Sequence, residues 1–316
     1  WGNFIHGFLS ALFAKGYWRM SSSNHSFVTE FILLGFSSDP TSNSILFIIF
    51  LLLYLCSIMG NGLIIILICL DSHLHTPMYF FLSILSLLDM SYVTTTMPQM
   101  LAHLLSSSKL ISFEGCWLQM YVFCALGITE SIYFAVMAYD RYVAICFPLR
   151  YMLILNWDLC VRLVVGTWAC GFFFSLLHTF FTMRLPFCGP NIVNHYFCEG
   201  PSVRSLACMD THLIEVIDLV LTILKIKSTQ SRYKAFSTCA SHLTMVTLFY
   251  VPAIYIYMRP TSHYTPERDK QISLFYNVFT ALLNPVVYSL RNKDIKAAFI
   301  KIVVNNREWK KKTPLY

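Results

Sequence analysis

The sequence contains few charged residues. Asp, Glu, Lys and Arg make up 12% of the 316 residues, whereas soluble globular domains contain about 25%. Hydrophobic residues account for 56%, and the mean hydropathy is +0.59. A soluble fold would have to hide several apolar runs that are longer than an ordinary core helix. This composition excludes a soluble domain and predicts a membrane protein.

Sequence motifs of enzymes and transporters are also missing. There is no Gly-rich phosphate loop, no zinc-ligand spacing and no intramembrane His/Asp set with hydrolase spacing. The internal repeats and paired broken helices of many transporters are absent as well. The net charge of +7 does not indicate nucleic-acid binding, because the basic residues are not spread over a soluble face. We therefore expect no enzyme, no transporter and no nucleic-acid partner.

Six apolar segments are long enough to cross the hydrocarbon core of a membrane, which takes about 20 helical residues. They lie near residues 45–70, 78–101, 117–145, 159–181, 236–258 and 272–290. We therefore expect an all-α, multi-pass membrane helix bundle over residues 45–290. The bundle is followed by a basic tail at 291–316. This tail should begin with an amphipathic helix and lie in the cytoplasm beside anionic lipid. Its basic residues are Arg291, Lys293, Lys296, Lys301, Arg307, Lys310, Lys311 and Lys312.

One further apolar segment, residues 213–224, is too short for a full span. As an α-helix it would extend about 18 Å at about 1.5 Å per residue, and it contains Glu215 and Asp218. With the N-terminus outside, six crossings would leave the basic tail outside, against the charge bias. Seven crossings would require this stunted helix to span, with local thinning of the bilayer. The sequence leaves both topologies open.

The N-terminal part of the chain divides into two segments. We interpret residues 1–19 as an upstream extension and residues 20–44 as the extracellular N-terminal tail of the membrane bundle. The apolar stretch at 8–14 is short for a signal peptide and has no small-residue cleavage site. Asn24 lies in an Asn-His-Ser glycosylation sequon, so we expect Asn24 to be glycosylated if this tail lies in the lumen.

Two motifs indicate a family. Residues 137–146 read MAYDRYVAIC, and residues 284–288 read NPVVY. Together they resemble the helix-3 and helix-7 signatures of rhodopsin-like G-protein-coupled receptors. The exact sequence of the first motif, together with PMYFFLS at 77–83 and KAFSTCASHL at 234–243, resembles the odorant-receptor branch. The resemblance covers about residues 21–299 and implies a seven-helix bundle with six full-length spans and a shortened fifth helix.

The resemblance implies a G-protein coupling switch at one end of the bundle. Arg141 has a fork of donors and keeps its charge, so it can pair with Asp140 at rest and with a partner's carbonyls when released. The alternative is an ordinary interfacial arginine. Pro285 removes a backbone donor and is expected to kink its helix. The residues assigned to this switch are Asp140, Arg141, Tyr142, Asn284, Pro285 and Tyr288.

Four polar residues from four helices are expected at one depth in the bundle: Asn61, Asp89, Glu130 and Asn284. Intramembrane carboxylates usually face the bundle interior and find partners there. As the resemblance implies, they would form a polar network that rearranges on activation and is a candidate sodium site. The alternative is a set of interhelical hydrogen bonds that only hold the bundle together. We expect no other cofactor and no metal centre.

A ligand pocket is expected between the outer halves of the helices. Three- and four-residue spacing brings apolar residues to one face of each of two segments. A mostly apolar surface with a few hydroxyls suits a small volatile or apolar ligand, although plain helix packing is an alternative for any one residue. The pocket residues are Phe123, Cys124, Gly127, Ile128, Tyr250, Ala253, Ile254 and Tyr257.

Four of the 11 cysteines are expected outside the membrane, where the oxidising environment favours disulfides. They are Cys116, Cys188, Cys198 and Cys208. Sequence alone allows three connectivities, and the resemblance implies Cys116–Cys198 and Cys188–Cys208. A metal site at His195 and Cys198 is disfavoured, because an oxidised cysteine supplies no thiolate.

The resulting hypothesis is an odorant receptor in the plasma membrane, with an extracellular N-terminus and a cytoplasmic C-terminus. It would bind a small, mostly apolar ligand, activate a heterotrimeric G protein and contact membrane lipid. The alternative is a non-functional receptor-derived product, retained in the endoplasmic reticulum, because the core of helix 5 is missing.

Overall fold

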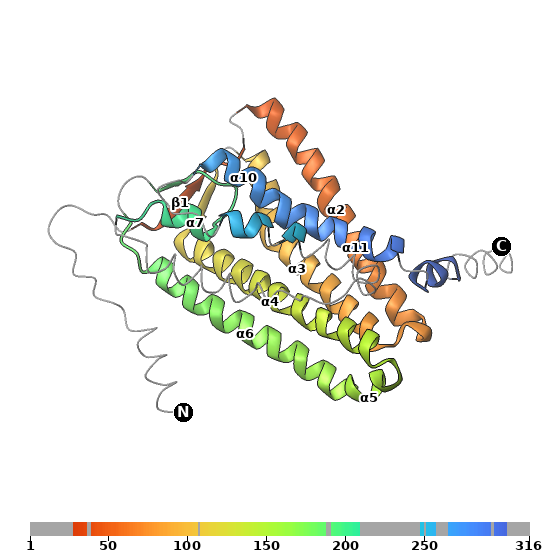
Figure 1. Cartoon of the computed structure of the whole chain (residues 1–316). Coiled ribbons are helices and arrows are strands. Elements are labelled where there is room, and N and C mark those ends of the chain that lie inside the picture. Colours follow the sequence, from red (N-terminus) through yellow and green to blue (C-terminus); the bar gives the residue numbers. More distant parts are fainter. Residues whose placement is uncertain are drawn as a thin grey trace, which may run out of the picture.

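Four long helices form most of the described structure (Figure 1). The computed structural model describes residues 28–36, 39–106, 108–187, 191–208, 247–249, 251–256, 265–291 and 294–301. The long helices are α2 (Pro40–Leu70), α3 (Pro77–Leu105), α4 (Phe113–Cys146) and α6 (Trp157–Met183), and each is long and apolar enough to cross a membrane. They match the predicted segments 45–70, 78–101, 117–145 and 159–181, with ends that differ by at most five residues.

The ends of these helices are set by local sequence signals. Asp39 accepts a hydrogen bond from the Ser42 amide at 2.8 Å, with Pro40 at the first helical position of α2. Ser112 caps α4 through the Gly115 amide at 3.1 Å, and Asn156 caps α6 through the Leu159 amide at 2.8 Å. Each cap satisfies an amide that the helix itself leaves without a partner.

The last helical region consists of three consecutive elements: α10 (Pro266–Leu274), the π-helix η4 (Phe275–Phe279) and α11 (Thr280–Arg291). Helix α11 continues through Pro285, and the π-helix η4 ends six residues before this proline. Residues 247–249, 251–256 and 294–301 are also helical. Of the remaining predicted segments, 213–224 lies outside the described residues and 236–258 is described only in part.

Helices α3 and α4 occupy the centre of the bundle. Helix α4 packs between α3 and α6, and α2 packs on α3 and α11 (Figure 1). In the most apolar 18-residue stretch of each helix, the buried share is 56% for α3 and 61% for α4, against 28% for α2 and 22% for α6. The exposed apolar faces of α2 and α6 are therefore the ones that lipid would cover. A side chain at Gly171 would collide with Thr129, so glycine permits the close contact of α6 with α4.

Short elements connect the helices at both ends. They include η1 (Ser72–Leu74), η2 (Pro148–Arg150), α5 (Tyr151–Ile154) and α7 (Gly200–Arg204). A three-stranded sheet of order β2-β1-β3 covers one end: β1 (Glu30–Leu33) pairs antiparallel with β2 (Leu110–Ser112) and parallel with β3 (Ile192–Val193). The all-α prediction did not include this sheet. We call this end, with Cys116 and Cys198, the disulfide end, and the other, with Asp140 and α5, the Asp140 end.

Candidate ligand-binding and coupling sites

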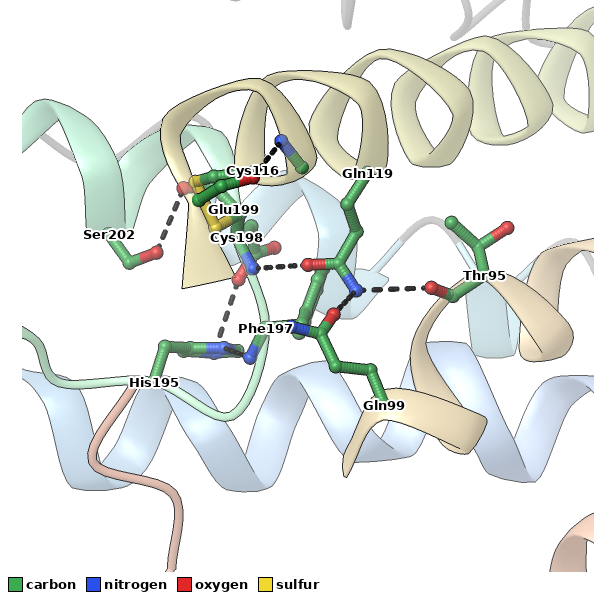
Figure 2. The surroundings of a disulfide bond; sticks show 11 residues. Thr95, Gln99, Cys116, Gln119, His195, Phe197, Cys198, Glu199 and Ser202 are labelled. Atoms are coloured by element: carbon green, nitrogen blue, oxygen red, sulfur yellow. Dashed lines mark hydrogen bonds and ion pairs between the residues drawn. A yellow bond between two sulfur atoms is a disulfide. The ribbon is translucent and has the colours of Figure 1, made fainter. Parts of the chain in front are cut away.

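A disulfide joins the start of α4 to the loop before α7. Cys116 and Cys198 are bonded, with Cα atoms 5.4 Å apart (Figure 2). This confirms the predicted pair and leaves Cys198 without a thiolate for a metal. Cys208 is also disulfide-bonded, while its predicted partner Cys188 lies outside the described residues, as does Asn24.

Gln119 connects this disulfide to α3. Its Oε1 accepts a hydrogen bond from the Cys198 amide at 3.0 Å. Its Nε2 donates to the Gln99 Oε1 at 2.6 Å and to the Thr95 carbonyl at 3.1 Å (Figure 2). The side chain is nearly buried, so these bonds satisfy polar atoms that water does not reach. Gln119 was not among the predicted site residues, although it lies three residues after Cys116 on the same face of the helix.

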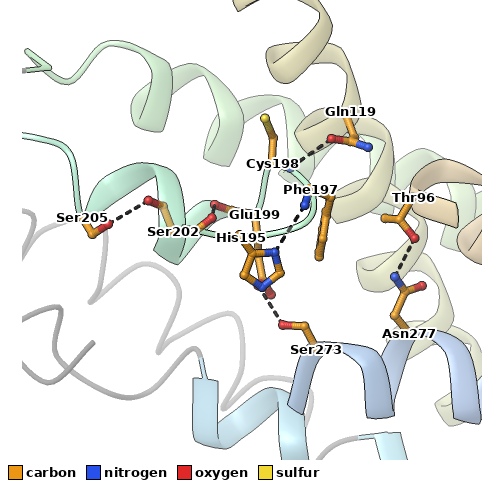
Figure 3. A network of polar contacts seen from close by, with 10 residues as sticks. All are labelled: Thr96, Gln119, His195, Phe197, Cys198, Glu199, Ser202, Ser205, Ser273 and Asn277. Carbon is orange, nitrogen blue, oxygen red and sulfur yellow. Dashed lines mark hydrogen bonds and ion pairs between the residues drawn. The ribbon is translucent and has the colours of Figure 1, made fainter. Parts of the chain in front are cut away.

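A second polar group connects the loop to α10 (Figure 3). His195 Nδ1 accepts from the Phe197 amide at 3.4 Å, so the neutral ring carries its proton on Nε2, which lies 3.3 Å from Glu199 Oε2. Burial lowers the pKa of His195 to about 3, and the charge of Lys270 adds to the shift. Ser273 on α10 donates to the same Glu199 oxygen at 2.9 Å.

The π-helix η4 makes a separate contact with α3. Asn277 Nδ2 donates to Thr96 Oγ1 at 2.7 Å, and both side chains are buried (Figure 3). The wide turn of η4 brings this amide to α3 at the point where the disulfide end meets the bundle. Together with Glu199, it ties the last helical region to the loop and to α3.

The predicted pocket residues on α4 lie among aromatic side chains. Phe123 is buried and stacks on Tyr92 of α3 with ring centroids 4.7 Å apart, and it lies 4.6 Å from the Phe197 ring. Gly127 faces the same Tyr92 ring, which would lie 3.4 Å from an added Cβ. Cys124 Sγ is 3.7 Å from His178 Nδ1 on α6. Tyr92 and His178 were not among the predicted pocket residues.

The other predicted pocket residues are described only in part. Ile128 is partly buried, as are Ala253 and Ile254 in the helical residues 251–256, whereas Tyr250 and Tyr257 lie outside the described residues. Phe249 of the same region lies 6.5 Å from Tyr92 and 5.8 Å from Phe134 between ring centroids. The aromatic contacts bring this region to the same part of α3 and α4.

The four residues of the predicted polar network are buried and lie near one another. Asn284 Nδ2 donates to Asp89 Oδ2 at 2.7 Å. Asn61 Nδ2 donates to the Ala281 carbonyl at 2.9 Å, one turn before Asn284. Glu130 interacts electrostatically with Asp89. The network thus connects α2, α3, α4 and α11 in the middle of the bundle.

At the Asp140 end, Asp140 has two partners. Arg141 Nε lies 3.8 Å from Asp140 Oδ2, which is the predicted pairing. Tyr151 on α5 donates its hydroxyl to Asp140 Oδ1 at 2.6 Å. Burial raises the pKa of Tyr151 above its usual range, and Asp140 adds to the shift, so the hydroxyl keeps its proton. Tyr142 is exposed, Pro285 is buried, and the side chain of Tyr288 lies outside the described residues.

The helical residues 294–301 dock on the same end of the bundle. Ile295 and Ala298 are buried against Leu74 and Leu82, while the opposite face is exposed. Tyr79 of α3 donates to Asp294 at 2.7 Å, and Lys301 Nζ lies 3.4 Å from Asp71. This helix is amphipathic, with its apolar face on the bundle.

A bundle of membrane-length helices with a buried polar core and an Asp-Arg pair at one end is typical of rhodopsin-like G-protein-coupled receptors. The family model described as olfactory receptor matches residues 50–221 and 211–306. The human (Homo sapiens) olfactory receptor 2A12 is 46% identical over 306 residues, covering 90% of this chain and 99% of the relative. The dog (Canis lupus familiaris) olfactory receptor-like protein OLF3 is 47% identical over 305 residues, covering 90% and 96%.

A mouse (Mus musculus) relative, olfactory receptor 5AR1, is 44% identical over 305 residues, with 90% of this chain and 98% of the relative covered. The chain therefore belongs to the olfactory receptor family. It is a seven-helix, multi-pass protein of the plasma membrane and not an enzyme. The family implies an odorant ligand and coupling to a G protein.

Proposed function

We propose that this odorant receptor has an extracellular disulfide end and a cytoplasmic Asp140 end. Disulfides form and persist in oxidising compartments, which favours an extracellular position for Cys116–Cys198. The basic tail favours a cytoplasmic position for the other end. Residues 20–44 would then be an extracellular tail glycosylated at Asn24.

The ligand would be a small, mostly apolar molecule in the disulfide-end half of the bundle. The supporting observation is the aromatic group of Tyr92, Phe123 and Phe197, which is in direct contact with the disulfide loop. We assign the pocket walls to Phe123, Cys124, Gly127, Ile128, Tyr250, Ala253, Ile254 and Tyr257. An apolar wall with few polar groups favours such a ligand over an amine or a phosphate.

Signalling would pass through the polar network to the Asp140 end. The observation that carries this proposal is the hydrogen bond between Asp89 and Asn284, which joins α3 to α11 in the middle of the bundle. Asn284, Pro285 and Tyr288 would move with α11 when the network rearranges, and a heterotrimeric G protein would meet Asp140, Arg141 and Tyr142. The carboxylates of Asp89 and Glu130 are hard oxygen donors, so their chemistry also fits a sodium ion.

We also infer a shortened helix 5 at residues 213–224 that still crosses the membrane. The match to the family model divides into two parts that overlap at residues 211–221, which supports a chain that lacks helix-5 sequence there. The basic residues on both sides of the last two spans favour seven crossings over six. Retention of a non-signalling product in the endoplasmic reticulum is the competing outcome.

The decisive experiment places different epitope tags at the two termini and compares antibody access in intact and permeabilised cells. An accessible N-terminal tag, a hidden C-terminal tag and a glycosidase-sensitive mass shift that Asn24→Gln abolishes are expected. Two accessible tags would mean six crossings, and the absence of a surface signal would mean retention. A matched chain with a full-length helix 5 separates the causes, because it should reach the surface if the short helix alone is the defect.

A further inference from the structure

Three polar side chains form a line across the disulfide-end half of the bundle. Cys124 Sγ on α4 lies 3.7 Å from His178 Nδ1 on α6. His178 Nε2 lies 3.0 Å from Arg204 NH1 on α7. His178 is 5% exposed and Arg204 is 3% exposed. Only Cys124 is partly exposed, so it marks the side from which a ligand would approach the line.

The chemistry of the line fixes where the imidazole proton lies. A guanidinium has five N–H donors and no acceptor, so Arg204 must donate to His178 Nε2. A neutral imidazole that accepts at Nε2 carries its proton on Nδ1. A charged imidazolium would place an N–H at Nε2 directly against the Arg204 donor. Arg204 thus keeps His178 neutral, with the Nδ1–H directed at Cys124.

The Cys124 thiol is a poor acceptor for this proton. Sulfur accepts hydrogen bonds weakly, and a normal N–H···O bond is about 2.7–3.2 Å long. An oxygen acceptor placed beside Cys124 would form a stronger bond with the Nδ1–H. Cys124 follows Phe123, whose ring stacks on Tyr92, so the neighbouring wall of the proposed pocket is largely aromatic, and an ionised ligand would lose its hydration there at high cost. A neutral carbonyl fits both conditions.

Gly200 holds the line in place. It begins α7, and a Cβ added at this position would lie 3.1 Å from His178 Cε1 and 3.5 Å from Arg204 NH1. A side chain at position 200 would therefore crowd the imidazole, which would have to shift by a few tenths of an ångström. The backbone of α7 thus packs directly on the His178–Arg204 pair.

We propose that His178 Nδ1–H is the polar anchor of the ligand pocket and selects small apolar molecules with one neutral carbonyl oxygen, such as aldehydes and ketones. Arg204 is a positioning residue that fixes the tautomer of His178. This inference rests on the proposed function, because it takes the space beside Cys124 as the ligand pocket.

The test measures protection of the Cys124 thiol in membranes that contain the full chain. A small methanethiosulfonate reagent labels the thiol, and mass spectrometry reports the rate at Cys124 separately from the other cysteines. The probes are octanal and 2-octanone, with nonane as a matched hydrocarbon. One hydrogen bond corresponds to a preference of about 3- to 10-fold. Octanal and 2-octanone should therefore protect the Cys124 thiol at concentrations about 3- to 10-fold lower than nonane does.

Paired variants distinguish an effect of the His178 tautomer on ligand binding from an effect of side-chain packing alone. In His178→Asn the side-chain N–H lies near the Nδ1 position, and in His178→Gln it lies near the Nε2 position. Arg204→Lys only donates, as arginine does, whereas Arg204→Met has no donor. The carbonyl preference should persist in His178→Asn and Arg204→Lys and be lost in His178→Gln and Arg204→Met. Surface amount and the Cys116–Cys198 disulfide are measured in each variant to verify the fold.

A merely structural role predicts a different pattern, in which both variants at one position behave alike. Equal protection by nonane and the carbonyl compounds, or a preference that survives in Arg204→Met, would overturn the inference and leave the proposed pocket intact. If none of the probes protects Cys124, the placement of the pocket fails together with the inference.

Discussion

The two ends of the bundle are held by different kinds of bond. At the disulfide end, Cys116–Cys198, a three-stranded sheet and the bonds of Gln119 fix the loop to α3 and α4. At the Asp140 end, the described contacts are apolar packing around Ile295 and Ala298 and polar side-chain pairs such as Tyr151–Asp140 and Tyr79–Asp294. A disulfide contributes about 2–5 kcal/mol, whereas a single hydrogen bond contributes about 0.5–1.5 kcal/mol and breaks reversibly.

This difference suits the two tasks of a receptor. A ligand that is recognised by a few contacts needs a pocket whose walls keep their positions, because ordering mobile walls costs binding free energy. A partner that must be recruited needs surfaces that change between two states with a small free-energy difference. The disulfide end provides walls that keep their positions, and the Asp140 end provides a surface that can change between two states.

The largest expected effect comes from breaking the covalent contact. Cys116→Ser removes the disulfide and leaves the loop held by hydrogen bonds and side-chain packing. The expected loss of about 2–5 kcal/mol is a large part of a typical total stability of about 5–15 kcal/mol. Surface display should therefore fall several-fold or more, measured by flow cytometry on intact cells. Cys170→Ser, an exposed free cysteine on α6, is the control, and equal losses in both variants would contradict the prediction.

At the Asp140 end, a smaller change should affect signalling more than folding. Tyr151→Phe removes the 2.6 Å hydrogen bond to Asp140. A hydrogen bond to a charged group contributes about 1.5–3 kcal/mol, and a bias of about 1.4 kcal/mol changes a population tenfold. If this bond stabilises the resting state, ligand-free signalling should rise several-fold, measured with a cAMP reporter normalised to surface amount.

The matched control for that prediction is Tyr139→Phe. Tyr139 is exposed on α4, one residue before Asp140, so the loss of its hydroxyl should leave basal signalling unchanged. A drop in signalling in Tyr151→Phe, with normal surface display, would mean that Tyr151 supports the active state instead of the resting state.

The third prediction concerns the pH dependence of the disulfide end. His195 has a folded pKa of about 3, below the value of about 6.5 in an unfolded chain. As the pH falls below about 6.5, the unfolded state binds a proton that the folded state excludes, so stability decreases by about 1.4 kcal/mol per pH unit. His195→Gln keeps an N–H near Glu199 and removes the titration, although Glu199 and Lys270 still face the site.

This prediction is measured as the unfolding temperature of the detergent-purified receptor at pH 7 and pH 5. The wild-type chain should lose more stability between the two values than His195→Gln does. His75→Gln, at an exposed histidine near the Asp140 end, serves as the control and should behave like the wild-type chain. An unchanged pH dependence in His195→Gln would mean that the imidazole is not held neutral.

The four long helices could be predicted from the sequence because their signals are local. Each is an apolar run of membrane length, and α2, α4 and α6 begin at capping residues, Asp39, Ser112 and Asn156. Depth along the helices predicts that Asp89 and Asn284 lie at one level, and their hydrogen bond places them together there. The Cys116–Cys198 pair, by contrast, was implied by the family resemblance and not by spacing.

The features that were missed depend on contacts between distant segments. Strand β1 pairs with β3 through Ile32 and Ile192, and strands of two to four residues carry no periodicity that would reveal such a pairing. The same holds for His178 and Arg204, which come from different elements and meet beside Gly200. Tyr151 lies eleven residues after Asp140, beyond the reach of helical spacing.

The smallest expected effects concern residues 294–301 and test whether the Asp140 end is held by individual contacts. Tyr79→Phe removes a partly buried hydrogen bond to Asp294, and should lower the unfolding temperature by about 2–4 °C. Lys301→Ala removes an ion pair whose lysine is largely exposed, and exposed pairs contribute little because solvent screens them. The change in Lys301→Ala should therefore be smaller than in Tyr79→Phe. If both variants instead destabilise the receptor as strongly as Cys116→Ser, the two ends are equally rigid and the contrast between them is wrong.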